Sequence, residues 1–354
     1  MDSTHSRVVV GLDNGGTNIN ATVLDAGGLP DAVDTTGFDP GGRFLVDRLV
    51  ETPSHVLDGP EVAVEALASA LDNVVQLTGV PRSAVRAVGL DTPGPASAHG
   101  VISSRGATNF SQPAWRGFDF RGALEARLGL PVIYNNDGNA AALYAHYSRF
   151  GPLAAQRSSV SAIVGTGLGG GVIESGQVVR GAAGMAGELG HVHIPLTDLL
   201  AEDQPLPRCN CGFTGDGESI ASLTGIAKNL LPYWLTRYPD HPLAGTEISA
   251  AAKAVRGYGE RGDPMARQIF AQQAMAIGRL FTIAANFTDP HAYFVGGGVV
   301  ETEPEFRDWF LATIREHTLL RSEQAAVASF ALVPDRDMAG ARGAAIAARE
   351  TLGA

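Results

Sequence analysis

The sequence predicts an α/β protein with two domains, and three observations support this fold class. Apolar runs of strand length alternate with helical patterns along the chain. Three clusters of glycine each follow an apolar run. With 354 residues, of which 45% are hydrophobic and 18% charged, the chain is long enough to bury two cores and too apolar to be disordered.

The first predicted elements form a strand pair. Residues 8–12 are apolar and predict a buried strand, and the polar and glycine residues 13–17 predict a turn. Residues 19–24 alternate between apolar and small or polar side chains, which indicates a second strand. Helical spacing follows at 61–78, and the apolar run 85–90 predicts the next strand.

Polar residues end the next strand of the predicted sheet. The strand at 131–134 leads into Asn135-Asn136-Asp137, and a helix is predicted at 140–147. A buried strand at 159–164 then opens a glycine-dense loop at 165–171.

The remaining elements are a hairpin, a helical region, a strand and a closing helix. Ser175-Gly176 at the centre of 172–179 indicates a hairpin turn. Residues 220–286 are largely helical, interrupted at Pro232, Pro239 and Pro242 with an inserted loop near Gly245. A strand at 291–295 ends in Gly296-Gly297-Gly298, and an Ala/Gly-rich helix at 339–348 closes the chain.

Charge and cysteine content exclude several classes of protein. The formal net charge of −11 argues against a surface for nucleic acid or anionic membrane. Two cysteines cannot form a disulfide framework, which fits a reducing compartment. No apolar run approaches the ~20 residues of a membrane span, and no signal peptide is evident. We therefore expect a soluble cytoplasmic protein.

The glycine clusters indicate phosphate binding, because backbone N–H groups after a strand can converge on an anion. Residues 11–17 have the spacing of a P-loop but lack its lysine. Gly165, Gly167 and Gly170 match a dinucleotide pattern, yet the following residues predict a hairpin where that motif requires a helix. Phosphate loops within hairpins favour the plan of actin-like ATPases.

Six segments together resemble the ROK family of sugar kinases and repressors. In chain order they are Asp13-Asn14-Gly15-Gly16-Thr17-Asn18, Asp91-Thr92-Pro93-Gly94-Pro95, Asn136-Asp137-Gly138-Asn139-Ala140-Ala141, Gly165-Thr166-Gly167-Leu168-Gly169-Gly170-Gly171, Gly184-Met185-Ala186-Gly187-Glu188-Leu189-Gly190-His191, and Cys209-Asn210-Cys211-Gly212 with Glu218. They follow the family's order over almost the whole chain.

The resemblance implies a two-lobed actin-like, ribonuclease H-like fold with a central cleft. It places a small lobe at 1–137, joined by the terminal helix at 338–354, and a large lobe at 138–337 that carries the sugar, zinc and adenosine segments. Repressors of the family carry an N-terminal helix-turn-helix, and a first strand near Val8 leaves no room for one. The implied activity is ATP-dependent phosphorylation of a sugar hydroxyl.

The resemblance also implies roles for polar residues around the sugar. Asp137 would be the general base that accepts the hydroxyl proton. Asn109, Asn136, Glu188, His191 and Glu218 would bind the sugar.

The nucleotide would be held mainly by backbone. Asp13 would position Mg²⁺ through water. The phosphates of ATP would face Gly15, Gly16 and Thr17 on one side and Gly165, Thr166 and Gly167 on the other, and adenosine would lie on Gly297 and Gly298. Asn18 stands where the family often has lysine, so positive charge would come from Mg²⁺ and backbone amides.

The zinc segment departs from the family pattern. The family uses one histidine and three cysteines, and here Asp216 stands in place of the third cysteine beside His191, Cys209 and Cys211. Aspartate can bind zinc, and His193 is close enough in sequence to substitute. The alternative is that zinc was lost and packing holds the loop.

The motifs leave the acceptor open. Phosphorylation of the 6-hydroxyl of a glucose-like hexose is the expectation. The departures from the family pattern indicate a specialised branch, and for such a branch the resemblance implies an amino sugar (kanosamine or N-acetylmannosamine type) or a C7-cyclitol of secondary metabolism. Fructose is also left open. A catalytically silent sugar sensor and a polyphosphate-using kinase are further alternatives. The intact Asp137 and both phosphate loops argue against the sensor, and the negative net charge argues against polyphosphate. A homodimer or homotetramer is expected.

Overall fold

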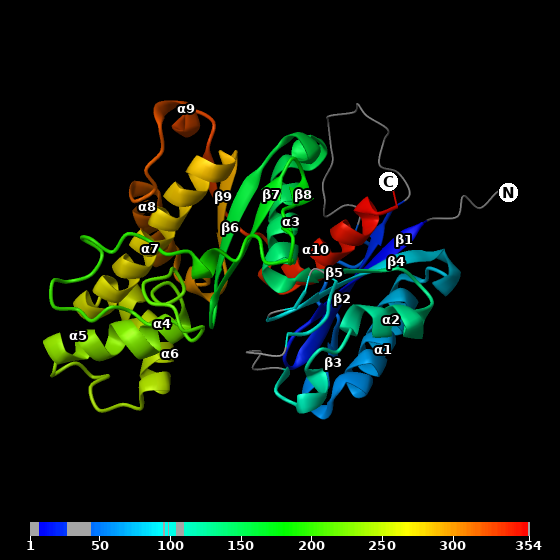
Figure 1. Cartoon of the computed structure of the whole chain (residues 1–354), viewed down its shortest axis with the longest axis horizontal. Helices are drawn as coiled ribbons and strands as arrows, with labels where there is room; N and C mark the ends of the chain where they lie inside the picture. Colours follow the sequence, from blue (N-terminus) through cyan, green and yellow to red (C-terminus); the bar gives the residue numbers. More distant parts are fainter. Residues whose placement is uncertain (1–6, 27–43, 95, 98, 104–109, 353–354) are drawn as a thin grey trace. The chain divides into compact units, whose positions relative to one another are not determined.

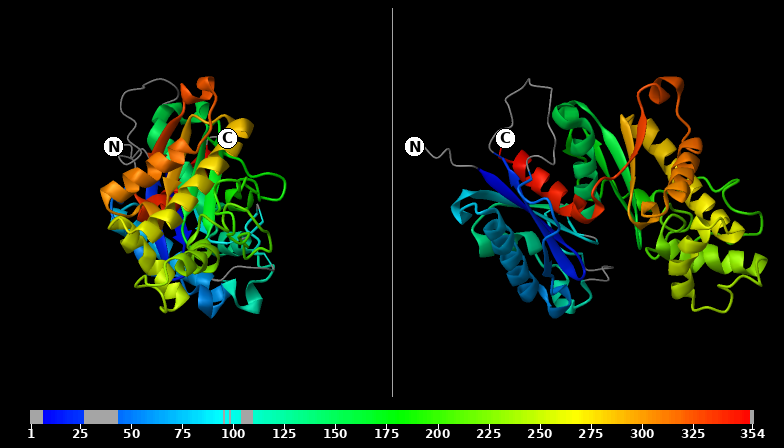
Figure 2. Two further views of the ribbon diagram at one scale, coloured as in Figure 1. Left: turned by 90° about the vertical axis from the view of Figure 1, so that its left-hand side faces the viewer. Right: turned by 180° about the vertical axis from the view of Figure 1, so that it is seen from behind.

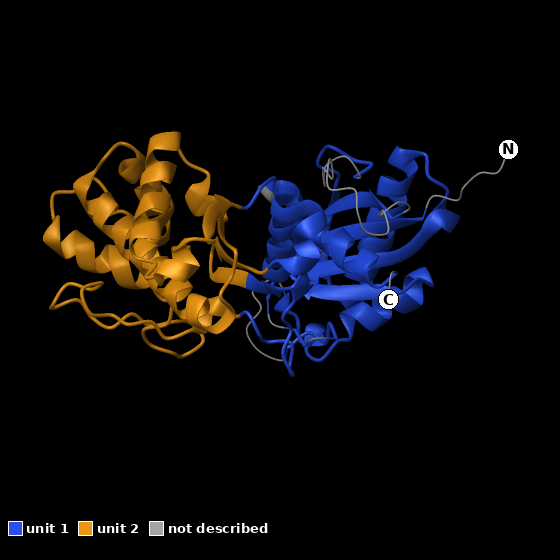
Figure 3. Ribbon diagram, turned by 90° about the horizontal axis from the view of Figure 1, so that it is seen from above, with its two compact units in different colours: residues 1–157, 171–187, 333–354 blue, residues 158–170, 188–332 orange. Residues whose placement is uncertain are grey.

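The computed structural model describes residues 7–26, 44–94, 96–97, 99–103 and 110–352. The chain forms two compact units (Figure 3). Unit 1 comprises residues 1–157, 171–187 and 333–354, and unit 2 comprises residues 158–170 and 188–332. The expected large lobe at 138–337 includes residues 138–157, 171–187 and 333–337, all of which belong to unit 1.

Unit 1 is built on a five-stranded mixed sheet in the order β3-β2-β1-β4-β5 (Figure 1). Its strands are β1 Val8–Asn14, β2 Asn18–Asp25, β3 Glu51–Pro53, β4 Val85–Thr92 and β5 Val132–Asn136. β1, β2 and β3 pair antiparallel, and β1, β4 and β5 pair parallel. The carboxyl ends of three parallel strands therefore lie at one edge of the sheet.

Two pairs of helices cover the two faces of this sheet (Figures 1 and 2). Their bounds are α1 Pro60–Thr78, α2 Phe120–Leu128, α3 Asp137–Phe150 and α10 Arg336–Glu350. Leu12 and Leu90 share a core with residues of α1 and α2. Val9 and Ala87 share the opposite core with residues of α3 and α10. Side chains alternate between the two cores along each strand, as a sheet buried on both faces requires.

Glycine allows α10 to rest directly on the sheet. A Cβ at Gly11 would lie 1.8 Å from the carbonyl oxygen of Ala341, and a Cβ at Gly89 would lie 1.9 Å from that of Ala344. Any side chain at these two positions would force the helix away from β1 and β4.

The second sheet has the order β10-β9-β6-β7-β8. Its strands are β6 Ser159–Val164, β7 Leu168–Glu174, β8 Gln177–Val178, β9 Ala292–Gly296 and β10 Ser329–Leu332. β9 pairs parallel with both β6 and β10. The helices of unit 2 are α4 Leu223–Gly225, α5 Leu231–Arg237, α6 Ile248–Glu260, α7 Pro264–Thr288, α8 Pro304–Glu316 and α9 Ser322–Ala325.

Most predicted elements are present. β6 has the predicted bounds, and the hairpin turn lies at Ser175-Gly176, where both φ angles are positive (50° and 78°). The predicted interruption at Pro232 is wrong: this residue lies in the first turn of α5, preceded by a π-helical turn at 226–230. Proline is accepted there because the first residues of a helix need no N–H partner. β3, α2, α8 and β10 were not predicted.

Candidate functional site

Asp137, the expected base, begins α3 directly after β5, and its side chain is exposed. Asn136 caps the helix, since its Oδ1 accepts a hydrogen bond from the backbone N–H of Asn139 at 2.7 Å. The backbone N–H of Gly138 donates to Oδ1 of Asp137 at 2.7 Å. A helix N-terminus favours the ionised carboxylate, so Asp137 is chemically able to accept a proton. Asn109, an expected sugar ligand, lies outside the described residues.

The first glycine turn, Gly15 to Thr17, joins β1 to β2. The backbone N–H of Gly15 donates to the carbonyl of Asn18 at 2.9 Å, which closes the turn. The side-chain amide of Asn18, which stands where the family often has lysine, donates to Glu51 at 2.9 Å. This turn therefore offers backbone amides and no side-chain cation of its own to an anion.

Asp13 precedes this turn and is half-buried. Burial raises the pKa of Asp13 above its usual value, and hydrogen bonds with Asp91 and Asn20 oppose the rise. Sequence reasoning gave Asp91 no individual role. The signal was an acidic residue at the end of an otherwise apolar strand, which the parallel register places beside Asp13.

The second glycine loop, Gly165 to Gly167, lies in unit 2 and joins β6 to β7. The backbone N–H of Gly165 donates to the carbonyl of Gly167 at 2.9 Å. The following segment is the strand β7, as predicted, where a dinucleotide-binding motif requires a helix. Gly297 adjoins this loop: its φ is 84°, and a Cβ on it would lie 2.2 Å from the carbonyl oxygen of Val164. The structure thus brings two of the expected nucleotide-binding segments together.

Glu218 links this loop to the cysteine segment. One carboxylate oxygen accepts a hydrogen bond from the backbone N–H of Leu168 at 2.9 Å, and the other accepts from the Cys209 thiol at 3.3 Å. Glu188, half-buried, immediately precedes the short helix Leu189–His191, and its carbonyl accepts the N–H of His191 at 3.1 Å. Three expected sugar ligands, Glu188, His191 and Glu218, therefore belong to one region of unit 2.

A potential metal-binding cluster is formed by His191, Cys209, Cys211 and Asp216, whose ligand atoms all lie within 4.8 Å of one another. Oδ2 of Asp216 lies 3.2 Å from Nδ1 of His191 and 3.7 Å from Sγ of Cys211. A tetrahedral zinc ion with bonds of about 2.0–2.3 Å separates its ligand atoms by roughly 3.3–3.8 Å. The donor types and their spacing therefore suit such an ion.

The protons in this cluster would have to leave before a metal could bind. The hydrogen bond with Asp216 raises the pKa of His191 to about 9. Burial raises the pKa of the Cys209 thiol well above its usual range. Zinc binds the deprotonated forms of both groups. His193, the alternative ligand, packs its ring on Phe213 at 5.5 Å between ring centres and is outside the four-residue cluster.

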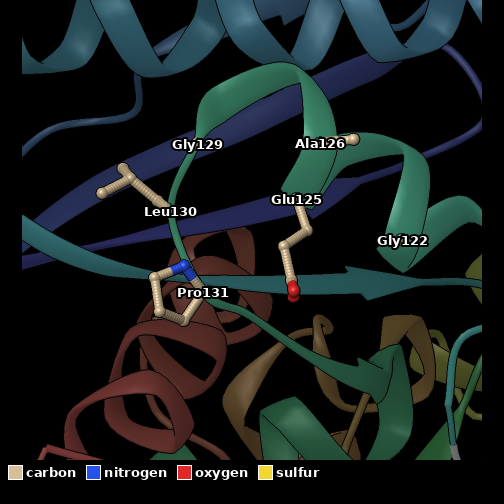
Figure 4. A pocket seen from close by; sticks show the side chains of 6 residues that line it. All are labelled: Gly122, Glu125, Ala126, Gly129, Leu130 and Pro131. Carbon is tan, nitrogen blue, oxygen red and sulfur yellow. The ribbon is translucent and has the colours of Figure 1, made fainter.

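A separate surface pocket in unit 1 contains none of the expected site residues (Figure 4). It is lined by Gly122, Glu125, Ala126, Gly129, Leu130 and Pro131. The Glu125 carboxylate accepts hydrogen bonds from Arg121 at 2.7 Å and from the backbone N–H of Val132 at 3.2 Å.

Among the described residues, no helix is both long enough and apolar enough to span a membrane.

Comparison with known proteins agrees with these motifs. The model of the ROK family matches residues 9–351. The chain belongs to the ROK family. A glucokinase from Halalkalibacterium halodurans is 31% identical over 315 residues, covering 88% of this chain and 85% of the relative. An N-acetyl-D-glucosamine kinase from Escherichia coli is 30% identical, covering 78% and 83% of the two chains.

Solved ROK structures share the fold. A ROK glucokinase from Streptomyces griseus, in complex with glucose and AMPPNP, is 28% identical with a TM-score of 0.63 and covers 97% of this chain and 99% of that one. The expected two-lobed actin-like α/β fold is confirmed. The chain is a ROK sugar kinase, a phosphotransferase.

Proposed function

We propose that this ROK kinase transfers the γ-phosphoryl group of ATP to the 6-hydroxyl of a glucose-like hexose, with Asp137 as the general base. The observation that carries the proposal is the exposed Asp137 carboxylate at the N-terminus of α3, in a chain whose relatives include glucokinases. The sugar oxygen bonds to the γ-phosphorus while the bond from that phosphorus to the β–γ bridging oxygen breaks. The hydroxyl proton passes to Asp137, and ADP leaves.

The other residues of the proposed site bind and orient the sugar and the nucleotide. Asn136, Glu188, His191 and Glu218 hold the sugar hydroxyls, with Asn109 as a further ligand. The backbone amides of the two glycine turns bind phosphate oxygens, and Gly297 and Gly298 accept the adenosine closely because they lack side chains. Little covalent help is needed in phosphoryl transfer, so positioning and charge neutralisation account for most of the rate.

Two metals fit the residues present. Asp13 would hold the hydration shell of Mg²⁺, and the side-chain oxygen of Asn20 beside it is buried without a hydrogen-bond partner among the described residues. Mg²⁺ would neutralise the phosphates. Zinc would be held by the cluster of His191, Cys209, Cys211 and Asp216. Its contribution would be structural, fixing the imidazole ring of His191 toward the sugar.

Asp137→Asn tests the base. We expect kcat to fall by about 10²–10⁴-fold, measured as ADP release with Mg-ATP and glucose, because the amide cannot accept the proton. Asp119→Asn is the matched control, since Asp119 is exposed and begins α2 as its N-cap, a role that asparagine also fills. Loss of activity in both variants, or in neither, would contradict the assignment.

An amino sugar is the second candidate acceptor, favoured by the similarity to the N-acetyl-D-glucosamine kinase. ADP release across glucose, mannose, N-acetylglucosamine, N-acetylmannosamine and kanosamine distinguishes the two. A site built to hydrogen-bond one substituent rejects analogues lacking it, by about 10⁴–10⁵-fold in favourable cases. A preference of this size for an amino sugar over glucose would replace the glucose proposal. Folded protein that binds sugar and turns over none of them would indicate a sensor.

A further inference from the structure

The second glycine loop is attached to the start of a helix in unit 2. α4 begins at Leu223 and continues through the π-helical turn at 226–230 into α5. The first N–H groups of a helix have no acceptor within the helix. Here the N–H of Leu223 donates to the carbonyl of Gly165 at 3.0 Å. The next N–H, that of Thr224, donates to the carbonyl of Thr166 at 3.1 Å. The helix start therefore holds two consecutive carbonyl groups of the loop.

Thr224 makes a second hydrogen bond to the same carbonyl. Its hydroxyl donates to the oxygen of Thr166 at 2.8 Å, so that oxygen accepts two hydrogen bonds, one for each lone pair. Thr166 is exposed, so water could satisfy its carbonyl in place of Thr224. The need to pair a buried polar group therefore does not explain this bond.

The two held carbonyls fix the direction of two N–H groups. In a trans peptide unit the C=O of one residue and the N–H of the next point in opposite directions, and no peptide bond among the described residues is cis. Because the C=O of Gly165 is turned toward Leu223, the N–H of Thr166 points away from α4. Because the C=O of Thr166 is turned toward Thr224, the N–H of Gly167 points away from it as well. Neither N–H has a hydrogen-bond partner within the described part of the chain.

The other polar groups of the loop are engaged within the protein. The N–H of Gly165 donates to the carbonyl of Gly167 at 2.9 Å, and the N–H of Leu168 donates to the carboxylate of Glu218 at 2.9 Å. The N–H groups of Thr166 and Gly167 therefore remain as the donors that the loop can offer to a ligand. Successive backbone N–H groups turned to the same side of a loop form a binding site for an anion.

This orientation needs support because glycine stands on both sides of Thr166. Glycine tolerates a wide range of backbone angles, so the peptide units of the loop can rotate at little cost. Half a turn of the unit between Thr166 and Gly167 would present a carbonyl oxygen where the N–H now points, and that oxygen would repel a phosphate oxygen. A protein that is only partly in its binding-competent state binds more weakly in proportion. The hydroxyl of Thr224 opposes the rotation, since the rotation would break both hydrogen bonds to the carbonyl of Thr166.

We propose that Thr224 is a positioning residue for the nucleotide, whose hydroxyl holds the carbonyl of Thr166 against α4 and so keeps the N–H of Gly167 directed toward the phosphates of ATP. The inference rests on the proposed binding of phosphate by this loop. Thr224 acts through the peptide unit of the loop, and it needs no contact of its own with nucleotide or sugar.

The proposal predicts an effect on the phosphates alone. Thr224→Val removes the hydroxyl and keeps the branched shape of the side chain. Loss of one neutral hydrogen bond corresponds to a change of about two- to tenfold in an equilibrium constant. We therefore expect the Kd for Mg-AMPPNP and the KM for ATP to rise by about that factor, with the Kd for adenosine and the KM for sugar unchanged. Thr224→Ser keeps the hydroxyl and should bind Mg-AMPPNP within about twofold of the wild-type protein.

Thr313→Val is the matched control. Thr313 is also a half-buried threonine of unit 2 whose hydroxyl donates to a backbone carbonyl, that of Trp309 at 2.9 Å, but this bond lies within α8. Thermal unfolding first confirms that each variant is folded at the assay temperature. Calorimetry on the full-length protein then measures the affinity for Mg-AMPPNP and for adenosine, and ADP release gives the KM for ATP and for sugar.

The outcomes separate this inference from the proposed function. If wild-type protein turns over sugar, while Thr224→Val binds Mg-AMPPNP as tightly as Thr313→Val, the positioning role is wrong and the kinase function stands. Equal weakening of Mg-AMPPNP and adenosine in Thr224→Val, or a Thr224→Ser variant as impaired as Thr224→Val, would also overturn the role.

The calorimetric comparison does not depend on turnover. If wild-type protein turns over no sugar, the proposed function fails, and a loss of affinity in Thr224→Val that is confined to Mg-AMPPNP still supports the inference. Wild-type protein that binds no Mg-AMPPNP would overturn both.

Discussion

The chemical behaviour of individual side chains in this chain depends on their immediate neighbours. Asp137 is exposed at a helix N-terminus, whereas Asp91 is buried beside a second carboxyl group. The same side chain therefore meets two different environments, one open to solvent and one in which burial and a neighbouring charge disfavour the ionised form. His191 is a third case, since its partner Asp216 raises its pKa to about 9.

Zinc affinity should depend on pH at this cluster. Below pH 9 His191 carries a proton that zinc must displace, and the Cys209 thiol must also lose one. The apparent affinity for zinc should therefore rise as pH increases from 6 to 9, with proton release on binding. Competition with a chromogenic chelator at a series of pH values measures it.

The variant Asp216→Ala serves as the control for that measurement. It removes one ligand and the hydrogen bond that raises the pKa of His191. We expect weaker binding with a flatter dependence on pH. Affinity independent of pH in the wild-type protein would count against coordination by His191.

Among the secondary-structure elements, α10 depends most visibly on glycine. It packs on β1 and β4 through Gly11 and Gly89, and a Cβ on its own Gly343 would lie 1.8 Å from the carbonyl oxygen of Ala140 in α3. These contacts join elements at opposite ends of the chain. Composition predicted an Ala/Gly-rich helix here, while its closeness to α3 follows from the packing.

Gly343→Ala and Gly257→Ala should change stability in opposite directions. Both replace glycine within a helix by alanine, which favours the helix by up to about 1 kcal/mol. At Gly257 the nearest atom to a Cβ is the far end of Arg261 at 3.4 Å, so we expect a gain. At Gly343 overpacking against α3 should cost about 1–3 kcal/mol. Denaturant unfolding measures the free energy of unfolding of both variants. Equal changes would show that α10 can shift away from α3 without a cost in stability.

At the scale of the whole molecule, the residues proposed for the site are distributed over both units. Unit 1 carries Asp13, Asn136 and Asp137, while unit 2 carries the second glycine loop, Glu188, Glu218 and the metal cluster. A substitution at a proposed site residue of either unit should lower turnover.

A homodimer or homotetramer remains the prediction for the assembled protein. Unit 2 exposes large apolar side chains, with Phe287 84% and Leu319 71% exposed. Burying such side chains in an interface is favourable. Sedimentation velocity at micromolar concentration should show a species of at least twice the 36.8 kDa chain mass. A single sedimenting species of chain mass would refute this.

Much of the fold could be predicted because its signals are local. Each of the apolar runs of β1, β4 and β6, and the Ser175-Gly176 turn, is a pattern formed by residues that are neighbours in sequence. Short elements such as β3 were missed, because three residues carry no periodicity. The break assigned to Pro232 was wrong because proline is accepted in the first turn of a helix.

The sequence by itself determined the α/β class, the order of the motifs and the membership of the ROK family, because each motif is a short run of residues. It did not determine which polar residues meet. The hydrogen bonds that link Leu168 through Glu218 to Cys209 depend on loops that return over tens of residues. Strand register places Asn20, Asp13, Asp91 and Asn135 side by side across the sheet. Only the tertiary structure decides such contacts, because a one-residue shift in register would send each side chain to the opposite face.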